Sequence, residues 1–277
     1  MKRFTVAQLT DLHVRPEGVP AYRVAETNML TERALRRVAA ESPAVDAVII
    51  TGDLTDCGLP SEYELLLGML RRTLTMPVYL IPGNHDRREV LLQHMPGTRS
   101  MTGGFVQYAV DDLPVRLVML DTVRPSAGYG ELCPQRLDWL DRTLAERPNQ
   151  PTLIGMHHPA FQCGIAHMDG IALREPEAFV AVIARHRQVQ RIVCGHHHRP
   201  VVAQVAQAIA SIAPSVAHQV QHDLSIDGPA AFVMEPSAFD LHLWDQRSSF
   251  VSHTVLVDSF PGPFPFLLDP DYPGWSG

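Results

Sequence analysis

The chain has 277 residues, 45% of them hydrophobic, which is enough for one large domain or a domain with a cap. Its formal net charge of −7 provides no overall basic field, so we expect no polymeric nucleic acid as a partner. The N-terminus lacks the apolar core of a signal peptide, and no stretch approaches the roughly 20 apolar residues of a membrane span. We therefore expect a cytoplasmic protein with no membrane partner.

Strand and helix patterns alternate along the first 81 residues. The apolar runs at 4–9, 46–50 and 78–81 predict strands. Residues 21–40 have the spacing of an amphipathic helix, and the segment Ser61–Glu64 has the pattern of a capping box, which predicts a helix to about residue 73.

The alternation continues through residue 194. Strands are predicted at 115–120, 152–156 and 191–194, and helices at 134–146, where a proline occupies the first turn, and at 176–186. Helices between buried strands are typical of an α/β fold in which helices pack on a largely buried sheet.

After residue 200 the helix patterns disappear. Strands are predicted at 201–205, 208–212, 230–234, 239–244 and 250–257, and we expect them to form a second sheet against the first. The catalytic domain then covers residues 1–258. Residues 259–277, rich in proline and aromatic residues, form a tail that packs on its own domain or lies at an interface with a neighbouring subunit.

Polar side chains follow five of the predicted strands, at the point where each strand ends. The clusters are Asp11 with His13, Asp53, Asn84 with His85, His157 with His158, and His196 to His198. Ligands of open α/β sheets bind beyond the carboxyl ends of strands, where loops from separate strands converge. We therefore expect these five strands to deliver their terminal side chains to one place.

The residue types in these clusters are those of a transition-metal site. Imidazole and carboxylate without thiolate favour Zn, Fe, Mn, Co or Ni. There are seven candidate ligands: Asp11, His13, Asp53, Asn84, His157, His196 and His198. One shared carboxylate would give each of two ions four protein ligands, and two ions about 3.5–4 Å apart suit an in-line displacement at phosphorus.

Five short motifs occur in order along the chain: Asp11-x-His13, Gly52-Asp53, Gly83-Asn84-His85-Asp86, His157-His158 and Gly195-His196-x-His198. This set resembles that of the calcineurin-like metallophosphoesterases, and the residues around it are similar to the bacterial glycerophosphodiesterase and class III cyclic-nucleotide phosphodiesterase branch. The resemblance covers most of residues 3 to about 220. It implies a four-layer α/β/β/α sandwich of mixed sheets with the active site at the carboxyl ends of the strands.

The resemblance also implies roles for the matching residues. Two divalent or trivalent transition-metal ions (Fe, Mn, Zn or Co) are expected, the first held by Asp11, His13, Asp53 and His198, and the second by the bridging Asp53 with Asn84, His157 and His196. His85 and Asp86 form the implied catalytic pair, in which Asp86 orients the His85 ring towards the phosphate. The implied substrate-binding residues are Asn84, His85, His196 and His218, and the implied nucleophile is a metal-bound hydroxide.

Several further residues carry expectations. Of the paired histidines we expect His158 to be structural, and we expect His197 to face solvent. The four cysteines have no C-x-x-C spacing and are expected to be reduced and mostly buried. Three loops are expected to shape the substrate pocket: residues 14–23, 94–104 and 160–174.

The implied function is the metal-dependent hydrolysis of small phosphodiesters by a homo-oligomer, with 3′,5′-cyclic nucleotides and glycerophosphodiesters both open as substrates. A protein or nucleotide phosphomonoesterase of the same superfamily is an alternative. A metallo-β-lactamase-type hydrolase would need His-x-His-x-Asp-His, which the sequence around residue 196 lacks. A non-catalytic scaffold on the same fold would be expected to have lost ligands.

Overall fold

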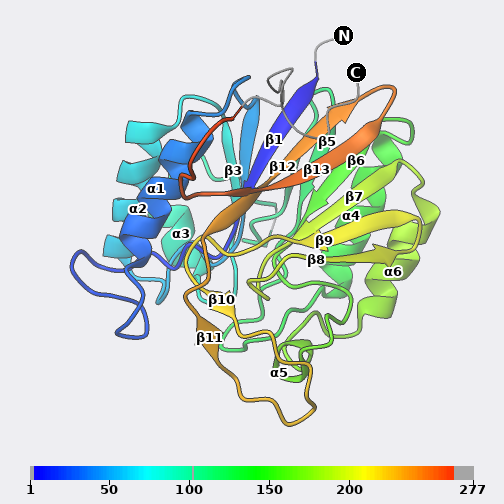
Figure 1. The fold of residues 1–277 in the computed structure, drawn as a ribbon. Helices are drawn as coiled ribbons and strands as arrows, with labels where there is room; N and C mark the ends of the chain where they lie inside the picture. The colour runs from blue at the N-terminus through cyan, green and yellow to red at the C-terminus, as the bar shows by residue number, and fades with distance from the viewer. Residues whose placement is uncertain (1–2, 102, 265–277) are drawn as a thin grey trace, which may run out of the picture.

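Two mixed sheets face each other at the centre of the protein, and helices cover their outer sides (Figure 1). The computed structural model describes residues 3–101 and 103–264. The first sheet has the order β13-β12-β1-β2-β3. Its strands are β1 (Phe4–Leu9), β2 (Ala47–Thr51), β3 (Val78–Ile81), β12 (Ala238–Asp245) and β13 (Ser249–Leu256).

The second sheet has the order β4-β5-β6-β7-β9-β8. Its strands are β4 (Tyr108–Val110), β5 (Arg116–Met119), β6 (Thr152–Gly155), β7 (Val189–Cys194), β8 (Val201–Val205) and β9 (Ala208–Ile212). A separate two-stranded ribbon consists of β10 (Gln219–Val220) and β11 (Phe232–Val233). In Figure 1 this ribbon lies below the two large sheets.

Six helices complete the described fold: α1 (Thr27–Ala39), α2 (Pro60–Thr73), α3 (Arg88–His94), α4 (Pro134–Glu146), α5 (Ala166–Asp169) and α6 (Pro176–Arg185). The first three lie on the side of the first sheet, and α4 and α6 lie on the side of the second (Figure 1). This is the α/β/β/α arrangement that the motifs implied. None of the helices in the described residues is long and apolar enough to cross a bilayer.

The central strands are buried along their whole length because both faces of each sheet are covered. Every residue of β1, β2, β5 and β6 is buried. Parallel pairing joins β1 to β2 and β2 to β3 in the first sheet, and β5, β6 and β7 in the second. Continuous apolar runs are typical of such doubly covered parallel strands, which is why the sequence located them well.

The prediction that the strands after residue 200 form a sheet of their own is wrong. Strands β8 and β9 extend the second sheet, where β9 pairs with β7. Strands β12 and β13 return to the first sheet, where β12 pairs antiparallel with β1. The pairing of β1 with β12 joins distant parts of the chain, and local periodicity carries no information about such partners.

Two helix starts differ from the sequence prediction. Residues Ala21 and Ala25 form a bridge in a tight turn, so α1 begins only at Thr27. Helix α2 begins at Pro60 with Leu59 as its N-cap, not at Ser61. The Glu62 carboxylate accepts hydrogen bonds from the amides of Leu59, at 3.0 Å, and Cys57, at 3.1 Å. The acidic residue that caps α2 is therefore Glu62, two residues before the Glu64 of the predicted capping box.

Two further expectations concern the cysteines and the C-terminal tail. All four cysteines are free, but only Cys194 is buried, and Cys57 is exposed. In the tail, Phe260 and Phe264 are 60% and 78% exposed, so these two rings do not pack on the domain. The other aromatic residues of the tail, Phe266, Tyr272 and Trp275, lie outside the described residues.

Candidate metal centre

Both sheets contribute strand ends to the site. The backbone amide of His196, after β7, donates to the Asp11 carboxylate, after β1, at 3.0 and 3.1 Å. The His157 ring, after β6, donates from Nδ1 to the carbonyl of Thr51, at the end of β2, at 2.8 Å. The convergence of strand ends that the sequence predicted is therefore present, and it crosses the interface between the sheets.

Five of the predicted ligands have a left-handed backbone. Their φ values are 54° for Asp11, 47° for His13, 46° for Asp53, 71° for His196 and 51° for His198. Residues other than glycine rarely adopt this region, and each such residue costs of order 1–3 kcal/mol. Strain of this kind persists where the surrounding fold imposes it, and it collects at functional sites. Here the fold turns the chain sharply after β1, β2 and β7, at the residues that carry these candidate ligands.

The first group of ligand atoms consists of side chains from Asp11, His13, Asp53 and His198, all within 4.8 Å of one another. The Nδ1 of His13 donates to Asp56, at 3.1 Å, and the Nδ1 of His198 donates to the carbonyl of His218, at 2.8 Å. Both Nε2 atoms therefore carry lone pairs. They lie 3.2 Å apart, and His198 Nε2 is 3.3 Å from the Asp11 carboxylate.

The second group is centred on His157. With its Nδ1–H donated to Thr51, His157 places Nε2 3.1 Å from the oxygen of the Asn84 side chain and 3.4 Å from Asp53 Oδ2. Burial acts to lower the pKa of His157, but Asp53 outweighs burial and raises it to about 9, so Nε2 carries a proton that a bound cation would displace. The Nε2–H of His196 donates to the carbonyl of Ile171, at 3.0 Å, which leaves its Nδ1 as the lone-pair atom. His157, His158 and His196 offer nitrogens within 4.8 Å of one another.

These two groups fit a pair of cations. In the first group, the Nε2 atoms of His13 and His198 face each other while their Nδ1 hydrogens are donated elsewhere, which is unfavourable unless positive charge lies between them. In the second group, the positive charge beside Asp53 is the proton on His157 Nε2, whose place a metal ion can take. Asp53 Oδ2 is 3.7 Å from His13 Nε2 and 3.4 Å from His157 Nε2, so one oxygen lies between the groups. Its Oδ1 accepts from the amide of His85, at 2.9 Å. The donor set of imidazole, carboxylate and amide oxygen is that of a transition-metal site without thiolate.

The field at the site keeps the carboxylates ionised. Burial acts to raise the pKa of Asp53, but the charges of His157 and His85 hold that pKa well below its usual value. Burial opposes ionisation of Asp11 in the same way, and His198 nevertheless lowers the pKa of Asp11. Both carboxylates are thus held as anions, which is the form that binds a cation.

His85 lies beside the two groups, and the contacts of its ring differ from the prediction. The Nδ1–H donates to the carbonyl of Asp56, at 2.8 Å, and the Asp56 carboxylate is 3.7 Å from the same nitrogen. Asp56, rather than Asp86, is therefore the residue that holds this ring. The sequence analysis missed Asp56, although its signal was a second carboxylate three residues after Asp53 in the same strand-end loop.

Asp86 instead organises the loops beneath the site. Its carboxylate accepts hydrogen bonds from the amides of Leu54 and Gly83, at 3.0 and 2.8 Å, and from the hydroxyls of Thr55 and Tyr63, each at 3.0 Å. Burial raises the pKa of Asp86 to about 6. These bonds tie the Asp53 loop to the Asn84 loop.

Three more histidines were assigned roles from the sequence. The Nδ1 of His158 is hydrogen-bonded to the Thr122 hydroxyl, at 2.8 Å, in line with a structural role. Its Nε2 has no hydrogen-bond partner in the described part of the chain. His197 is wholly buried rather than solvated. The ring of His218 is 4.7 Å from that of His198 and lines the cavity above the site.

Two cavities flank the centre and share Asn84 and His85. One, of about 240 Å³, has an aromatic and apolar wall that includes Tyr22, Met168 and Phe232. The other, of about 590 Å³, is polar and runs towards Arg87 and Ser126. Of the three loops expected here, 14–23 and 160–174 supply lining residues. The segments 230–232 and 123–128, which the sequence analysis missed, supply others.

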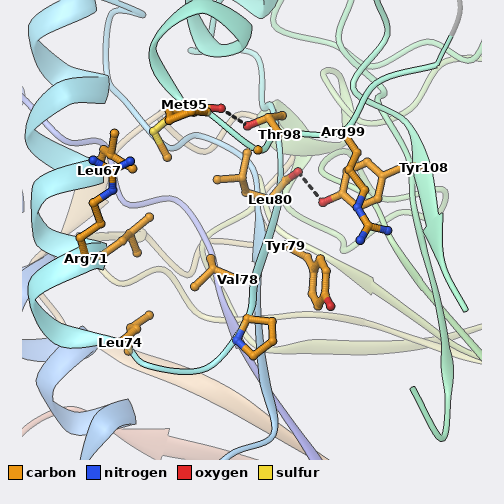
Figure 2. A pocket seen from close by; sticks show the side chains of 14 residues that line it. Leu67, Arg71, Leu74, Val78, Tyr79, Leu80, Met95, Thr98, Arg99 and Tyr108 are labelled. Atoms are coloured by element: carbon orange, nitrogen blue, oxygen red, sulfur yellow. Dashed lines mark hydrogen bonds between the residues drawn. The ribbon is translucent and has the colours of Figure 1, made fainter. Parts of the chain in front are cut away.

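The third expected loop, residues 94–104, borders a different hollow. Figure 2 shows this pocket of about 420 Å³ between α2 and β3, with Met95, Thr98 and Arg99 on one side and Leu67 and Leu74 on the other. None of the predicted site residues lines it. The expectation that this loop shapes the substrate pocket is therefore wrong.

Comparison with known proteins fixes the family. Residues 4–200 match the calcineurin-like phosphoesterases. The chain belongs to this family. It is 34% identical over 263 residues to the "Probable glycerophosphodiester phosphodiesterase GpdQ" of Arcobacter nitrofigilis, covering 94% of this chain and 96% of that protein. It is 36% identical over 264 residues to a "Probable cyclic nucleotide phosphodiesterase" of Rhodopseudomonas palustris, covering 94% and 95%.

The fold of this phosphoesterase is also found in solved structures of distant sequence. A dimetal phosphatase from Danio rerio superposes with a TM-score of 0.63 at 18% identity, covering 92% of this chain and 99% of that one. The likeness to it is a likeness of fold. The sequence relatives match nearly the whole chain, including β12 and β13 beyond the family match.

Proposed function

We propose that this protein hydrolyses small phosphodiesters at a pair of transition-metal ions. The ions would be held by Asp11, His13, Asp53 and His198 on one side, and by Asp53, Asn84, His157 and His196 on the other. The observation that carries the proposal is the lone-pair arrangement: facing Nε2 atoms 3.2 Å apart whose hydrogens are donated elsewhere. When bound, such ions supply Lewis-acid stabilisation of phosphate oxygens and lower the pKa of water.

His85 supplies the proton in this proposal. Because its Nδ1–H is donated to the carbonyl of Asp56, the free Nε2 is the atom that can reach a substrate in the two cavities that His85 lines. Burial acts to lower the pKa of His85, but Asp53 and Asp56 outweigh burial and raise it. A protonated Nε2–H then donates to the oxygen of the leaving alcohol, and Asp56 fixes the orientation of the ring.

The two flanking cavities suit a diester, which has two organic arms on one phosphorus. The aromatic wall with Tyr22 and Phe232 offers a stacking surface, and the larger polar cavity offers room for a hydroxylated or charged alcohol. Cyclic nucleotides and glycerophosphodiesters both have this chemistry, and the names of the two relatives above include both.

Three finer points belong to the same proposal. The ions are Fe, Mn, Zn or Co, which the imidazole and carboxylate donors favour. The protein works in the cytoplasm, in line with four free cysteines. It forms a homo-oligomer, for which the exposed rings of Phe260 and Phe264 offer an apolar contact surface.

The test is removal and return of metal. The full chain is stripped with a chelator, assayed on bis(p-nitrophenyl) phosphate, and assayed again after addition of Mn²⁺, Co²⁺ or Zn²⁺. We expect no turnover of the stripped protein and full recovery with metal. A folded, metal-loaded protein that does not hydrolyse the diester would overturn the proposal in favour of a binding scaffold.

A substrate panel then separates the open alternatives. Cyclic AMP, glycerophosphocholine and glycerophosphoethanolamine are compared with p-nitrophenyl phosphate, a monoester. We expect kcat/KM for at least one diester to exceed that for the monoester. The reverse order would identify a phosphomonoesterase of the same family.

A further inference from the structure

A second cluster of metal-ligating side chains lies outside the dinuclear centre. It consists of Cys163 and Asp169, from the segment around α5, and His197, from the loop after β7. The sulfur, a carboxylate oxygen and a ring nitrogen all lie within 4.8 Å of one another. Bonds of about 2.0–2.3 Å to a single Zn²⁺ need only small side-chain rotations from such a starting point.

His197 is the observation that points to a ligand. The ring is 0% exposed, and neither Nδ1 nor Nε2 has a hydrogen-bond partner of normal geometry among the residues that the structure describes. The carbonyl of Met168 lies near the ring, yet it forms no hydrogen bond of regular geometry with either nitrogen. An imidazole with both nitrogens buried and unpaired loses its hydration without compensation, and a bound cation would restore it.

The other two residues are arranged around the same point. The Asp169 carboxylate accepts from the amides of Cys163, at 2.7 Å, and Gly164, at 3.0 Å, which fixes it without consuming all of its lone pairs. The Cys163 sulfur accepts only a long bond from the amide of Ile165, at 3.5 Å. A carboxylate and a thiolate together neutralise a divalent ion, and a mixed sulfur, nitrogen and oxygen set suits Zn²⁺ or Co²⁺.

We propose that Cys163, Asp169 and His197 form a third metal site, which binds a divalent ion of the Zn²⁺ type and ties the α5 segment to the end of β7. On binding, the ion replaces the thiol proton of Cys163, which passes to solvent. The tied segment is part of the substrate cavity, since Met168 and Ile171 line it, and the Ile171 carbonyl accepts from the His196 ring. The proposal does not depend on the proposed reaction.

Cobalt distinguishes this site from the dinuclear centre, because the donors there are imidazole, carboxylate and amide oxygen only. Metal-free full-length protein is titrated with Co²⁺ under reducing, anaerobic conditions and followed in the near ultraviolet, where thiolate-to-cobalt charge transfer absorbs. We expect this band in the wild type and its loss in Cys163→Ser, which should also bind one equivalent of metal fewer. Cys57→Ser is the matched control, because Cys57 is exposed beside Asp56, and it should keep the band.

Two results would overturn the proposal: no charge-transfer band at saturating Co²⁺, or a band of wild-type strength in Cys163→Ser. Circular dichroism checks that this variant is folded. If it is not, His197→Gln provides the test, since loss of one ligand should move the band to at least about tenfold higher Co²⁺. An unchanged titration in His197→Gln would contradict the role of His197 and with it the site.

Discussion

The two sheets make unlike contributions to the centre. The first sheet, through the ends of β1, β2 and β3, supplies the carboxylates described above at the candidate centre: Asp11, Asp53, Asp56 and Asp86. The second sheet, through the ends of β6 and β7, supplies only the imidazoles of His157, His196 and His198. All the candidate carboxylate ligands therefore come from the first sheet, together with His13 and Asn84, and the second sheet adds only imidazoles, so neither layer alone completes a site.

Because of this division, metal binding at the centre should depend on how the two sheets pack against each other. The Asp11 carboxylate holds the amide of His196, and Thr51 holds the His157 ring, so each sheet positions ligands of the other. A change at the contact between the sheets should disturb the metals, and a change in the charge of one side should disturb the balance between the two ions.

The largest effect should follow from removing the carboxylate that lies between the two groups. Asp53→Ala should lower kcat by at least about 10³-fold, since even a single electrostatic stabiliser is typically worth about 10²–10³. Metal content should fall as well, because both proposed sites lose a ligand. The exposed Asp138→Ala is the control and should be active. A folded Asp53→Ala that keeps more than a few per cent of wild-type turnover would contradict the bridging role.

His85→Ala should lower kcat by about 10²–10⁴, the usual contribution of general acid–base catalysis, with metal content near that of the wild type. The loss should be smaller on bis(p-nitrophenyl) phosphate than on a glycerophosphodiester, because p-nitrophenolate leaves without a proton. His94→Ala, on α3, is the control. Equal losses on both substrates would indicate that the ring positions the substrate instead of donating a proton.

The charge difference between the two ligand groups predicts unequal metal affinity. The first ion would have Asp11 and a share of Asp53, and the second only its share of Asp53. Unit charges about 4 Å apart interact by about 4 kcal/mol at an effective dielectric of 20, so Asn84→Asp should tighten the weaker site by at least about tenfold. Calorimetric titration of metal-free protein measures this, with the exposed Asn149→Asp as control. Two equal and tight sites in the wild type would show that charge does not set the order.

Gly195→Ala tests the contact between the sheets directly. A Cβ at this position, after β7, would lie 2.0 Å from the hydroxyl of Thr10 and 2.8 Å from the Asp11 carboxylate. The loss in unfolding free energy should be about 1–3 kcal/mol, the usual cost of overpacking, and Asp11 should bind metal less well. Gly68→Ala, inside α2, should instead stabilise by about 0.5–1 kcal/mol. Denaturant unfolding of both variants measures these changes in unfolding free energy. A Gly195→Ala variant as stable as the wild type would mean that the sheets can separate at this point.

The sequence predicted local features of the site well and missed the contacts between distant parts of the chain. Each strand end could be located because a buried apolar run followed by glycine and polar residues is a local pattern, as at Gly52-Asp53. The pairing of β1 with β12 was missed because it depends on residues far apart in the chain. The contact of Asp56 with His85 was missed for a similar reason, since it arises where the loops after β2 and β3 meet. The 230–232 segment lines the smaller cavity, and this was missed because its position depends on the path of an irregular loop.

The smallest effect concerns the buried polar chain that joins the sheets beneath the centre. The Nε2–H of His242, in β12, donates to the side-chain oxygen of Gln8, at 3.0 Å, and the Gln8 amide donates to the carbonyl of Cys194, in β7, at 2.9 Å. The Ser252 hydroxyl is 2.7 Å from His242 Nδ1. Burial, with a further contribution from Arg191, lowers the pKa of His242 to about 3. The neutral ring is therefore the form that the folded protein accepts.

Between pH 6.5, the ordinary pKa of histidine, and about 3, the unfolded chain binds a proton at residue 242 that the folded protein does not. Stability due to this group is complete above pH 6.5 and is lost as the pH falls, by up to about 1.4 kcal/mol per pH unit. His242→Gln removes the proton site, so the gap in unfolding free energy between wild type and variant should narrow from pH 7.5 to pH 5. Urea unfolding in excess chelator measures both, and subtraction cancels the other histidines. His222→Gln, at an exposed position, is the matched control. Parallel profiles for His242→Gln would mean that its ring has the same pKa in the folded and the unfolded protein, and burial in the polar chain would then not disfavour the protonated ring.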